Sequence, residues 1–106
     1  MRRIQHYING QSIDSSEALA NKVLNPATGD QVAETIVATT QEVDLAVLSA
    51  KTAFGDWSNT SIAHRTKLLY KFRNLVLENT NRIAELITEE HGKVLEDARG
   101  EVARGI

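Results

Sequence analysis

The spacing of apolar residues changes at about residue 39, and this change constrains the fold more than any other feature of the chain. In the first part, short runs containing β-branched residues are separated by turn signals, which is typical of strands. In the second part, apolar residues recur every three or four positions, which predicts amphipathic helices. The chain is therefore expected to be α+β, with β-hairpins in residues 1–38 and about four helices in residues 39–106.

Two turn signals divide the first part. Asn9-Gly10 separates two short extended runs, which predicts a type I′ hairpin over residues 5–14. The segment Asn25–Asp30 contains Pro26, which sets φ, and a glycine that permits a left-handed conformation. This segment predicts a second hairpin-like pair, formed by residues 22–24 and 31–37. Because an isolated hairpin is only marginally stable in water, we expect helices or a larger sheet to cover these strands.

The first helix is predicted over residues 40–54. Thr39 and Glu42 have the spacing of a capping box at its start. Gly55 and the polar residues that follow it are expected to interrupt the helix. Trp57, at the end of the apolar stripe, is interpreted as an anchor of the core.

Three further helices are predicted after that interruption. The second ends near Glu78, and Asn79 or Thr80 is expected to cap the third. Gly92 is assigned as the C-cap of the third helix, and the fourth begins near Val94. The residues expected to face inward are Leu68, Leu69, Phe72, Leu75 and Val76 in the second helix and Ile83, Leu86 and Ile87 in the third.

The last helix carries apolar residues on one face up to the final position, at Leu95, Ala98, Val102 and Ile106. A complete domain normally ends its last helix with a cap or a polar cluster, and neither follows here. We therefore expect the sequence to be the front part of a larger protein.

Composition narrows the classes of function. The formal net charge is −2, and acidic and basic residues are interspersed, so neither a nucleic-acid partner nor a membrane partner is favoured. The sequence has no apolar run long enough for a transmembrane helix and no signal-peptide pattern, so a cytoplasmic location is expected. The chain contains no cysteine, which removes thiol nucleophiles, disulfides and thiolate metal sites.

Several patterns are better explained by structure than by chemistry. Residues 100–105 match G-x-x-x-x-G but lack the Lys-Ser/Thr of a phosphate-binding loop, so a role in helix packing is favoured. The three histidines, which are His6, His64 and His91, have no partners at metal-ligand spacing, and no metal ligand is assigned. The adjacent Glu89 and Glu90 point in different directions from a helix and predict a solvated acidic face rather than an acid/base pair.

Arg104 is the candidate binding residue. It lies between Ala103 and Gly105, whose small size lets a ligand approach the long side chain. A guanidinium at this position is suited to bidentate binding of a carboxylate. The alternative is a surface salt bridge with Glu101 or Asp97, which spacing alone favours.

An ordered set of motifs covers nearly all of the chain. Its segments are His6–Gly10, Asn25–Gly29, Val43–Asp44, Ala46–Val47, Ala50–Lys51, Ala53–Phe54, Trp57–Ser58, Arg65, Glu90–Lys93, Asp97–Ala98 and Gly100–Gly105. At these spacings the set resembles the amino-terminal segment of the aldehyde dehydrogenase superfamily. Within the superfamily, the last part of the chain looks most like the methylmalonate-semialdehyde dehydrogenases, the CoA-acylating branch.

The resemblance implies both a fold and a reaction. Members of the superfamily are larger α/β enzymes, and residues 1–106 would be the first part of their discontinuous NAD-binding domain. A cysteine thiolate attacks the aldehyde, hydride passes to NAD, and a thioester is resolved. In this branch CoA takes the acyl group, and the implied substrate is methylmalonate semialdehyde or malonate semialdehyde.

The resemblance assigns few functional residues to this chain. The nucleophilic cysteine, the general-base glutamate and the nucleotide-binding unit of the superfamily match no position in residues 1–106. Arg104 matches the arginine of the G-E-V-x-R-G segment, which in this branch is associated with the substrate carboxylate. A homo-oligomer is expected, and the isolated chain is expected to be inactive. The alternative function is a freestanding, non-catalytic helical interaction module.

Overall fold

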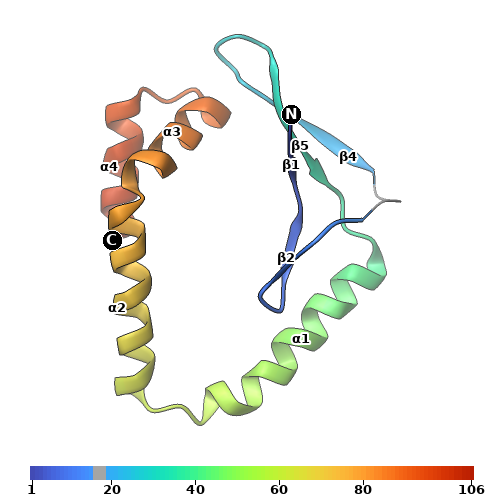
Figure 1. Ribbon diagram of the computed structural model, residues 1–106, viewed down its shortest axis with the longest axis vertical. Coiled ribbons are helices and arrows are strands. Elements are labelled where there is room, and N and C mark those ends of the chain that lie inside the picture. Colours follow the sequence, from blue (N-terminus) through green and yellow to red (C-terminus); the bar gives the residue numbers. More distant parts are fainter. Residues whose placement is uncertain (16–18) are drawn as a thin grey trace. The chain divides into compact units, whose positions relative to one another are not determined.

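The computed structural model describes residues 1–15 and 19–106, and these form two compact units. The first unit comprises residues 1–23 and 31–60, and the second comprises residues 24–30 and 61–106. The elements follow one another along the chain as β1 (Arg2–Ile4), β2 (His6–Ile8), β3 (Gln11–Ile13), β4 (Ala20–Leu24), β5 (Gln31–Ile36), α1 (Thr40–Ser58), α2 (Ile62–Glu78), α3 (Thr80–His91) and α4 (Leu95–Gly105), and all except β3 are labelled in Figure 1.

The predicted Asn-Gly hairpin is confirmed. Strands β2 and β3 pair in antiparallel fashion, with His6 opposite Ile13. Asn9 has a φ of 53° and Gly10 a φ of 75°, so both central residues have the positive φ that a type I′ turn requires. Helix α1 contacts β2, so the hairpin packs against a helix as its marginal stability requires.

The second predicted pair, β4 and β5, also forms. Two hydrogen bonds delimit it, from Asn25 N–H to the Asp30 carbonyl and from Val37 N–H to the Leu19 carbonyl, so the strands run in opposite directions. Gly29 in the connecting turn has a φ of 77°, as the sequence suggests.

Strand β1 is not predicted from the sequence. It pairs in parallel with β5, with Arg2 opposite Ala33, and completes a sheet of order β1-β5-β4. The strand has three residues, two of which are arginines, so it carries almost no local strand signal. Its pairing places β5 in the centre of the sheet, where Ala33 and Ile36 are buried.

Arg3 links β1 to two other parts of the first unit. Its guanidinium donates hydrogen bonds to Glu34 on β5, to Asp14 at 2.9 Å and to the Ser15 carbonyl at 3.2 Å. The hydrogen bond from Arg3 is the main cause that lowers the pKa of Asp14, and the bond to Glu34 is the main cause that raises the pKa of Arg3. The arginine thus ties the edge strand to the segment that follows β3.

Helix α1 starts as predicted but extends further. The Thr39 hydroxyl accepts from Glu42 N–H at 3.2 Å, and the Glu42 carboxylate accepts from Thr39 N–H at 2.7 Å, which confirms the capping box. Gly55 does not interrupt the helix, which continues to Ser58. Trp57 is 43% exposed, so its assignment as a core anchor is wrong for this chain.

The boundaries of the last three helices agree closely with the predictions. Asn79 occupies the N-cap position of α3, as expected, but its side chain makes no capping hydrogen bond there. The side-chain amide of Asn79 donates to the Leu75 carbonyl, and the Thr80 hydroxyl donates to the carbonyls of Val76 and Leu77. Both side chains therefore stabilise the end of α2, and the N-terminus of α3 has no side-chain cap.

Gly92 ends α3 as predicted, and it also meets the loop of the second unit that contains Pro26. Its φ is 80°, in the left-handed region, and its N–H donates to the Thr88 carbonyl. A Cβ at Gly92 would lie 2.8 Å from Cγ of Pro26. The loop and the turn between α3 and α4 therefore approach so closely that only glycine fits.

Small residues make the core of the second unit. Helix α3 packs against α4, and Ala84, Ala98 and Val102 are buried there.

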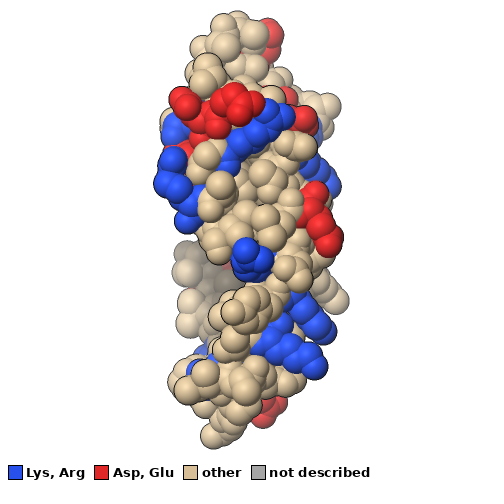
Figure 2. Space-filling view, turned by 90° about the vertical axis from the view of Figure 1, so that its left-hand side faces the viewer, with Lys and Arg blue, Asp and Glu red and all other residues tan. Residues whose placement is uncertain are grey.

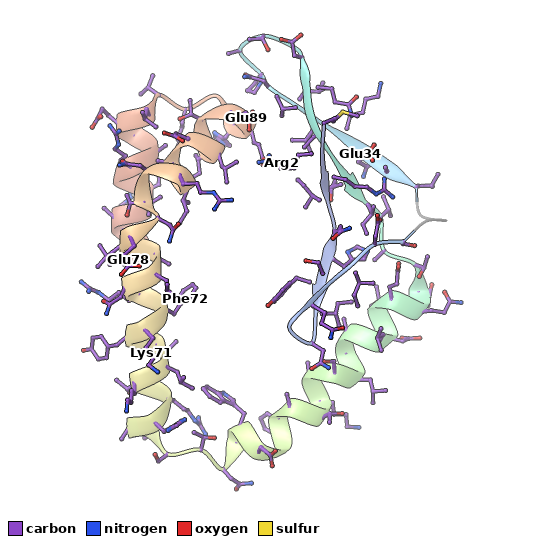
Figure 3. All side chains as sticks on the ribbon, in the orientation of Figure 1. Arg2, Glu34, Lys71, Phe72, Glu78 and Glu89 are labelled. Carbon is purple, nitrogen blue, oxygen red and sulfur yellow. The ribbon has the colours of Figure 1, made fainter. Side chains whose placement is uncertain are left out.

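Helices α1 and α2, by contrast, have no buried residue in the described part of the chain. Phe72 is 65% exposed and projects from α2 (Figure 3), and Figure 2 shows broad uncharged surface between the charged side chains. The apolar stripes of α1 and α2 are thus largely uncovered, whereas Ile83, Leu86 and Ile87 on α3 are half-buried. The exposed large residues of the two uncovered stripes include Val43, Val47, Phe54, Leu68, Leu69, Phe72 and Leu75.

Replacing Gly92 with alanine is expected to destabilise the chain by about 1–3 kcal/mol, because a left-handed φ is unfavourable for alanine and the new Cβ meets Pro26. Urea unfolding followed by circular dichroism measures the change. Gly55→Ala is the matched control, since Gly55 is helical and has nothing within 4 Å of a new Cβ. The control should be stabilised, by up to about 1 kcal/mol. Equal effects of both substitutions would contradict this account of Gly92.

The purified chain is expected to self-associate, because the uncovered stripes on α1 and α2 expose large apolar side chains to water. Light scattering should report a mass above that of a monomer. The double substitution Phe54→Glu and Phe72→Glu should shift the chain toward monomer, since both side chains are exposed members of the stripes. A monomeric parent chain that melts cooperatively and binds no hydrophobic dye would refute the expectation.

Candidate functional site

Arg104, the candidate binding residue, lies in the last turn of α4, and its side chain is 72% exposed. One of its terminal nitrogens, Nη2, lies 3.9 Å from Oε1 of Glu101, three residues earlier on the helix. This separation permits an ion pair but exceeds the range of a hydrogen bond. Of the two partners considered from spacing, Glu101 is therefore the one near Arg104, and the guanidinium remains accessible.

Glu101 is more strongly bound by another cation. The ammonium group of Lys93 donates a hydrogen bond to Oε1 of Glu101, the same oxygen that lies near Arg104. This hydrogen bond is the main cause that lowers the pKa of Glu101, with smaller contributions from the charges of Lys93, Arg104 and His91. Partial desolvation opposes the shift. Glu101 is thus ionised at neutral pH.

Sequence reasoning missed the part played by Lys93. The residue belongs to the segment Glu90–Lys93, but it was assigned no partner there. Lys93 and Glu101 are eight positions apart, across the turn between α3 and α4, so the spacing of a single helix does not pair them. The left-handed turn at Gly92 brings Lys93 and Glu101 together. The only sign of this pairing in the sequence is that the two side chains carry opposite charges.

Gly100 provides space beside Arg104. Nη1 of Arg104 lies 3.7 Å from the position that a Cβ of Gly100 would occupy, which is an ordinary van der Waals contact. The arginine side chain therefore follows the helix surface back toward Gly100 and Glu101. Residues 100–105, which match G-x-x-x-x-G, lie within α4 and the turn of helix that carries this arginine.

Charged side chains of both signs surround the site. On the same helix, Arg99 bonds to Glu96 and, at 3.0 Å, to the side chain of Asn81 on α3. Figure 2 shows basic and acidic side chains gathered together on this face of the molecule. Glu96 is paired with Arg99, and Glu101 is paired with Lys93. Arg104 is only 3.9 Å from Glu101 and makes no hydrogen bond to it, so Arg104 is the cation of this helix that is best placed to bind an added anion.

The other residues considered from the sequence form no second site. His6 lies in the first unit, with Nε2 3.7 Å from Oε2 of Glu42, whereas His64 and His91 lie on α2 and α3. Glu89 and Glu90 lie side by side near the end of α3. Within residues 1–15 and 19–106, no group of three or more histidine and carboxylate side chains could hold a metal ion.

The groups at Arg104 are suited to binding an anion rather than to covalent chemistry. An accessible guanidinium can bind a planar carboxylate through two parallel hydrogen bonds. The sequence contains no cysteine, so these residues provide no thiol nucleophile.

No helix in the described part of the chain is long and apolar enough to cross a membrane.

Comparisons with known proteins identify the family. The sequence model of the aldehyde dehydrogenase family matches residues 13–106. The chain is 42% identical over 106 residues to malonate-semialdehyde dehydrogenase 1 of Shouchella clausii, and 39% identical to a malonate-semialdehyde dehydrogenase of Listeria monocytogenes. Each match covers all of this chain but only 22% of the relative, so the chain spans about a fifth of the length of these relatives.

Solved structures agree with the sequence comparisons. The methylmalonate-semialdehyde dehydrogenase of Oceanimonas doudoroffii matches with a TM-score of 0.94 and 38% identity, over 99% of this chain and 21% of that protein. A Sinorhizobium meliloti protein assigned as a methylmalonate-semialdehyde dehydrogenase, in complex with NAD, matches with a TM-score of 0.94 and 33% identity, over the same shares of the two chains. Sequence and structure thus lead to one conclusion: the chain belongs to the aldehyde dehydrogenase family.

Proposed function

We propose that this chain is the amino-terminal part of an enzyme that oxidises malonate semialdehyde or methylmalonate semialdehyde to an acyl-CoA. The observation that carries the proposal is the similarity of the whole chain to malonate-semialdehyde dehydrogenases, at 42% identity over 106 residues. The exposed guanidinium of Arg104 supports it, because these substrates carry a carboxylate in addition to the aldehyde. The role of CoA as acyl acceptor is inferred from the branch that the sequence resembles.

The proposed cofactor is NAD, which the Sinorhizobium meliloti relative binds. The connection from β5 to α1 does not fit a dinucleotide. Such cofactors bind where a glycine-rich turn leads from a strand to a helix N-terminus. Here β5 leads into α1 through residues 37–39, which contain no glycine, and the Glu42 carboxylate occupies the helix N-terminus. A pyrophosphate would meet a negative charge there, so we assign NAD binding to residues beyond this chain.

Arg104 is proposed to bind the carboxylate of the substrate and to orient the aldehyde. Its planar group can hold both carboxylate oxygens at once, which fixes the direction of the rest of a small substrate. Binding energy at this end of the molecule then helps to position the distant aldehyde carbon for attack. An uncharged aldehyde lacks this interaction, so the arginine favours semialdehydes that carry an acid group.

The remaining expectations follow the same proposal. We propose a homo-oligomer in the cytoplasm, without nucleic-acid or membrane partners. The uncovered apolar faces of α1 and α2 support further association, within a longer chain or between chains. A freestanding interaction module is the less favoured function, because the named relatives that match the whole chain are enzymes.

The 106-residue chain alone is expected to oxidise no aldehyde, because it has no cysteine to form the thioester. NADH formation from malonate semialdehyde, NAD and CoA is followed by absorbance. A no-protein reaction is the negative control, and the Shouchella clausii enzyme is the positive control. Aldehyde-dependent NADH above the no-protein control, with contaminating enzyme excluded by mass spectrometry, would overturn this expectation.

The role of Arg104 is tested in a chimera in which residues 1–106 replace the segment of the Shouchella clausii enzyme that they match. Arg104→Ala should lower kcat/KM for malonate semialdehyde roughly ten- to a hundred-fold, the loss of a charge-assisted pair of about 1.5–3 kcal/mol. Propionaldehyde, which has no carboxylate, should be little affected. Arg104→Lys should recover only part of the activity, because an ammonium group cannot form the bidentate pair.

Arg99→Ala serves as the matched control, since Arg99 lies on the same helix and pairs with Glu96. It should leave the preference for malonate semialdehyde over propionaldehyde unchanged. Equal losses on both aldehydes in the Arg104 variants would instead mean that Arg104 supports the fold through Glu101.

A further inference from the structure

One carboxylate lies near two cations in the second unit. Oε1 of Glu101 accepts a hydrogen bond from Lys93, and the same oxygen lies 3.9 Å from Nη2 of Arg104. Within the residues that the structure describes, Glu101 is the one ion-pair partner of Arg104. The three side chains therefore form an unequal triad, in which the lysine is in direct contact with the acid and the arginine stands apart.

The backbone holds this unequal arrangement in place. Lys93 directly follows Gly92, whose left-handed φ of 80° and close approach to Pro26 leave room for no other residue. Glu101 lies on α4 between the buried residues Ala98 and Val102, which pack this helix against α3. The backbone of Lys93 and the backbone of Glu101 are thus both held by packing contacts. Arg104, in contrast, lies in the last turn of its helix.

Lys93 and Arg104 compete for Glu101. Residues three apart on a helix surface are neighbours, so an unpaired Glu101 would be able to form a closer ion pair with Arg104. The Lys93 ammonium satisfies the acid first and neutralises its charge. The guanidinium therefore keeps its hydrogen-bond donors for an added carboxylate.

We propose that Lys93 is a specificity-determining positioning residue, which occupies Glu101 and thereby leaves Arg104 available to the carboxylate of the substrate. This inference rests on the proposed function, because it takes Arg104 as the group that binds the substrate carboxylate. Without Lys93, Glu101 turns to Arg104 and acts as an internal competitor of the substrate. The competitor disappears when Glu101 also loses its charge.

A double-substitution cycle in the chimera tests the inference. Lys93→Met should lower kcat/KM for malonate semialdehyde about two- to five-fold, the range expected for capture by a surface ion pair. It should not change kcat/KM for propionaldehyde. Glu101→Gln alone should retain the parent value, and Lys93→Met combined with Glu101→Gln should recover it. Lys93→Arg, which keeps a donor for Glu101, should remain close to the parent.

Binding of malonate provides a readout that needs no turnover. Calorimetric titration measures the dissociation constant for malonate. In Lys93→Met this constant should rise by the same factor by which kcat/KM falls. In the double variant it should return to the value of the parent chimera. Glu96→Gln is the matched control, since Glu96 is a carboxylate on the same helix with its own partner, Arg99. This control should change neither measurement.

The outcomes separate the inference from the proposed function. If Arg104→Ala causes no selective loss, the proposed role of Arg104 fails and the inference fails with it. If Arg104→Ala is selective but Lys93→Met is not, only the inference is overturned. A loss in Lys93→Met that Glu101→Gln does not restore, or one that is equal for both aldehydes, would mean that Lys93 supports the fold and would also overturn the inference.

Discussion

Gly92 adopts a φ of 80° against the ring of Pro26, and the second unit is organised around this contact. The left-handed residue ends α3 and reverses the chain, so that α4 packs on α3 through the small side chains Ala84 and Ala98. The same reversal places Lys93 beside Glu101. A backbone requirement at Gly92 therefore determines the electrostatic surroundings of Arg104, the candidate binding residue, twelve positions further along the chain.

The first unit depends on a different interaction, in which one arginine joins segments that are distant in the sequence. Arg3 bonds to Asp14 and Glu34, so β1 is held both to its neighbouring strand and to the segment after β3. The capping box of Thr39 and Glu42 then sets the start of α1. Polar contacts at strand and helix ends define this unit, whose buried apolar residues are Ala33 and Ile36.

Several features that depend on neighbouring residues could be predicted from the sequence, whereas features that depend on distant residues could not. Two local predictions failed, because α1 continues through Gly55 and no side chain caps the start of α3. The Asn9-Gly10 turn and the capping box are encoded within a few positions, and both are present in the structure. Strand β1 exists only because β5 pairs with it, and the contact of Lys93 with Glu101 exists only because the chain reverses between them. The position of Trp57 at the end of an apolar stripe predicts a core residue, but its side chain is 43% exposed. Arg104 was identified from a motif, since its immediate spacing favoured only a salt bridge.

The uncovered faces of α1 and α2 affect how a longer protein of this family is synthesised. The named relatives are more than four times as long as this chain, and the proposed function places the chain at the amino-terminal end of a protein of that kind. Translation proceeds at roughly 5–20 residues per second, so in such a protein these helices leave the ribosome tens of seconds before the last residues are made. Until a partner surface is made, apolar stripes left as uncovered as they are here would be exposed to water, and exposed apolar surface of this kind favours contacts with other proteins.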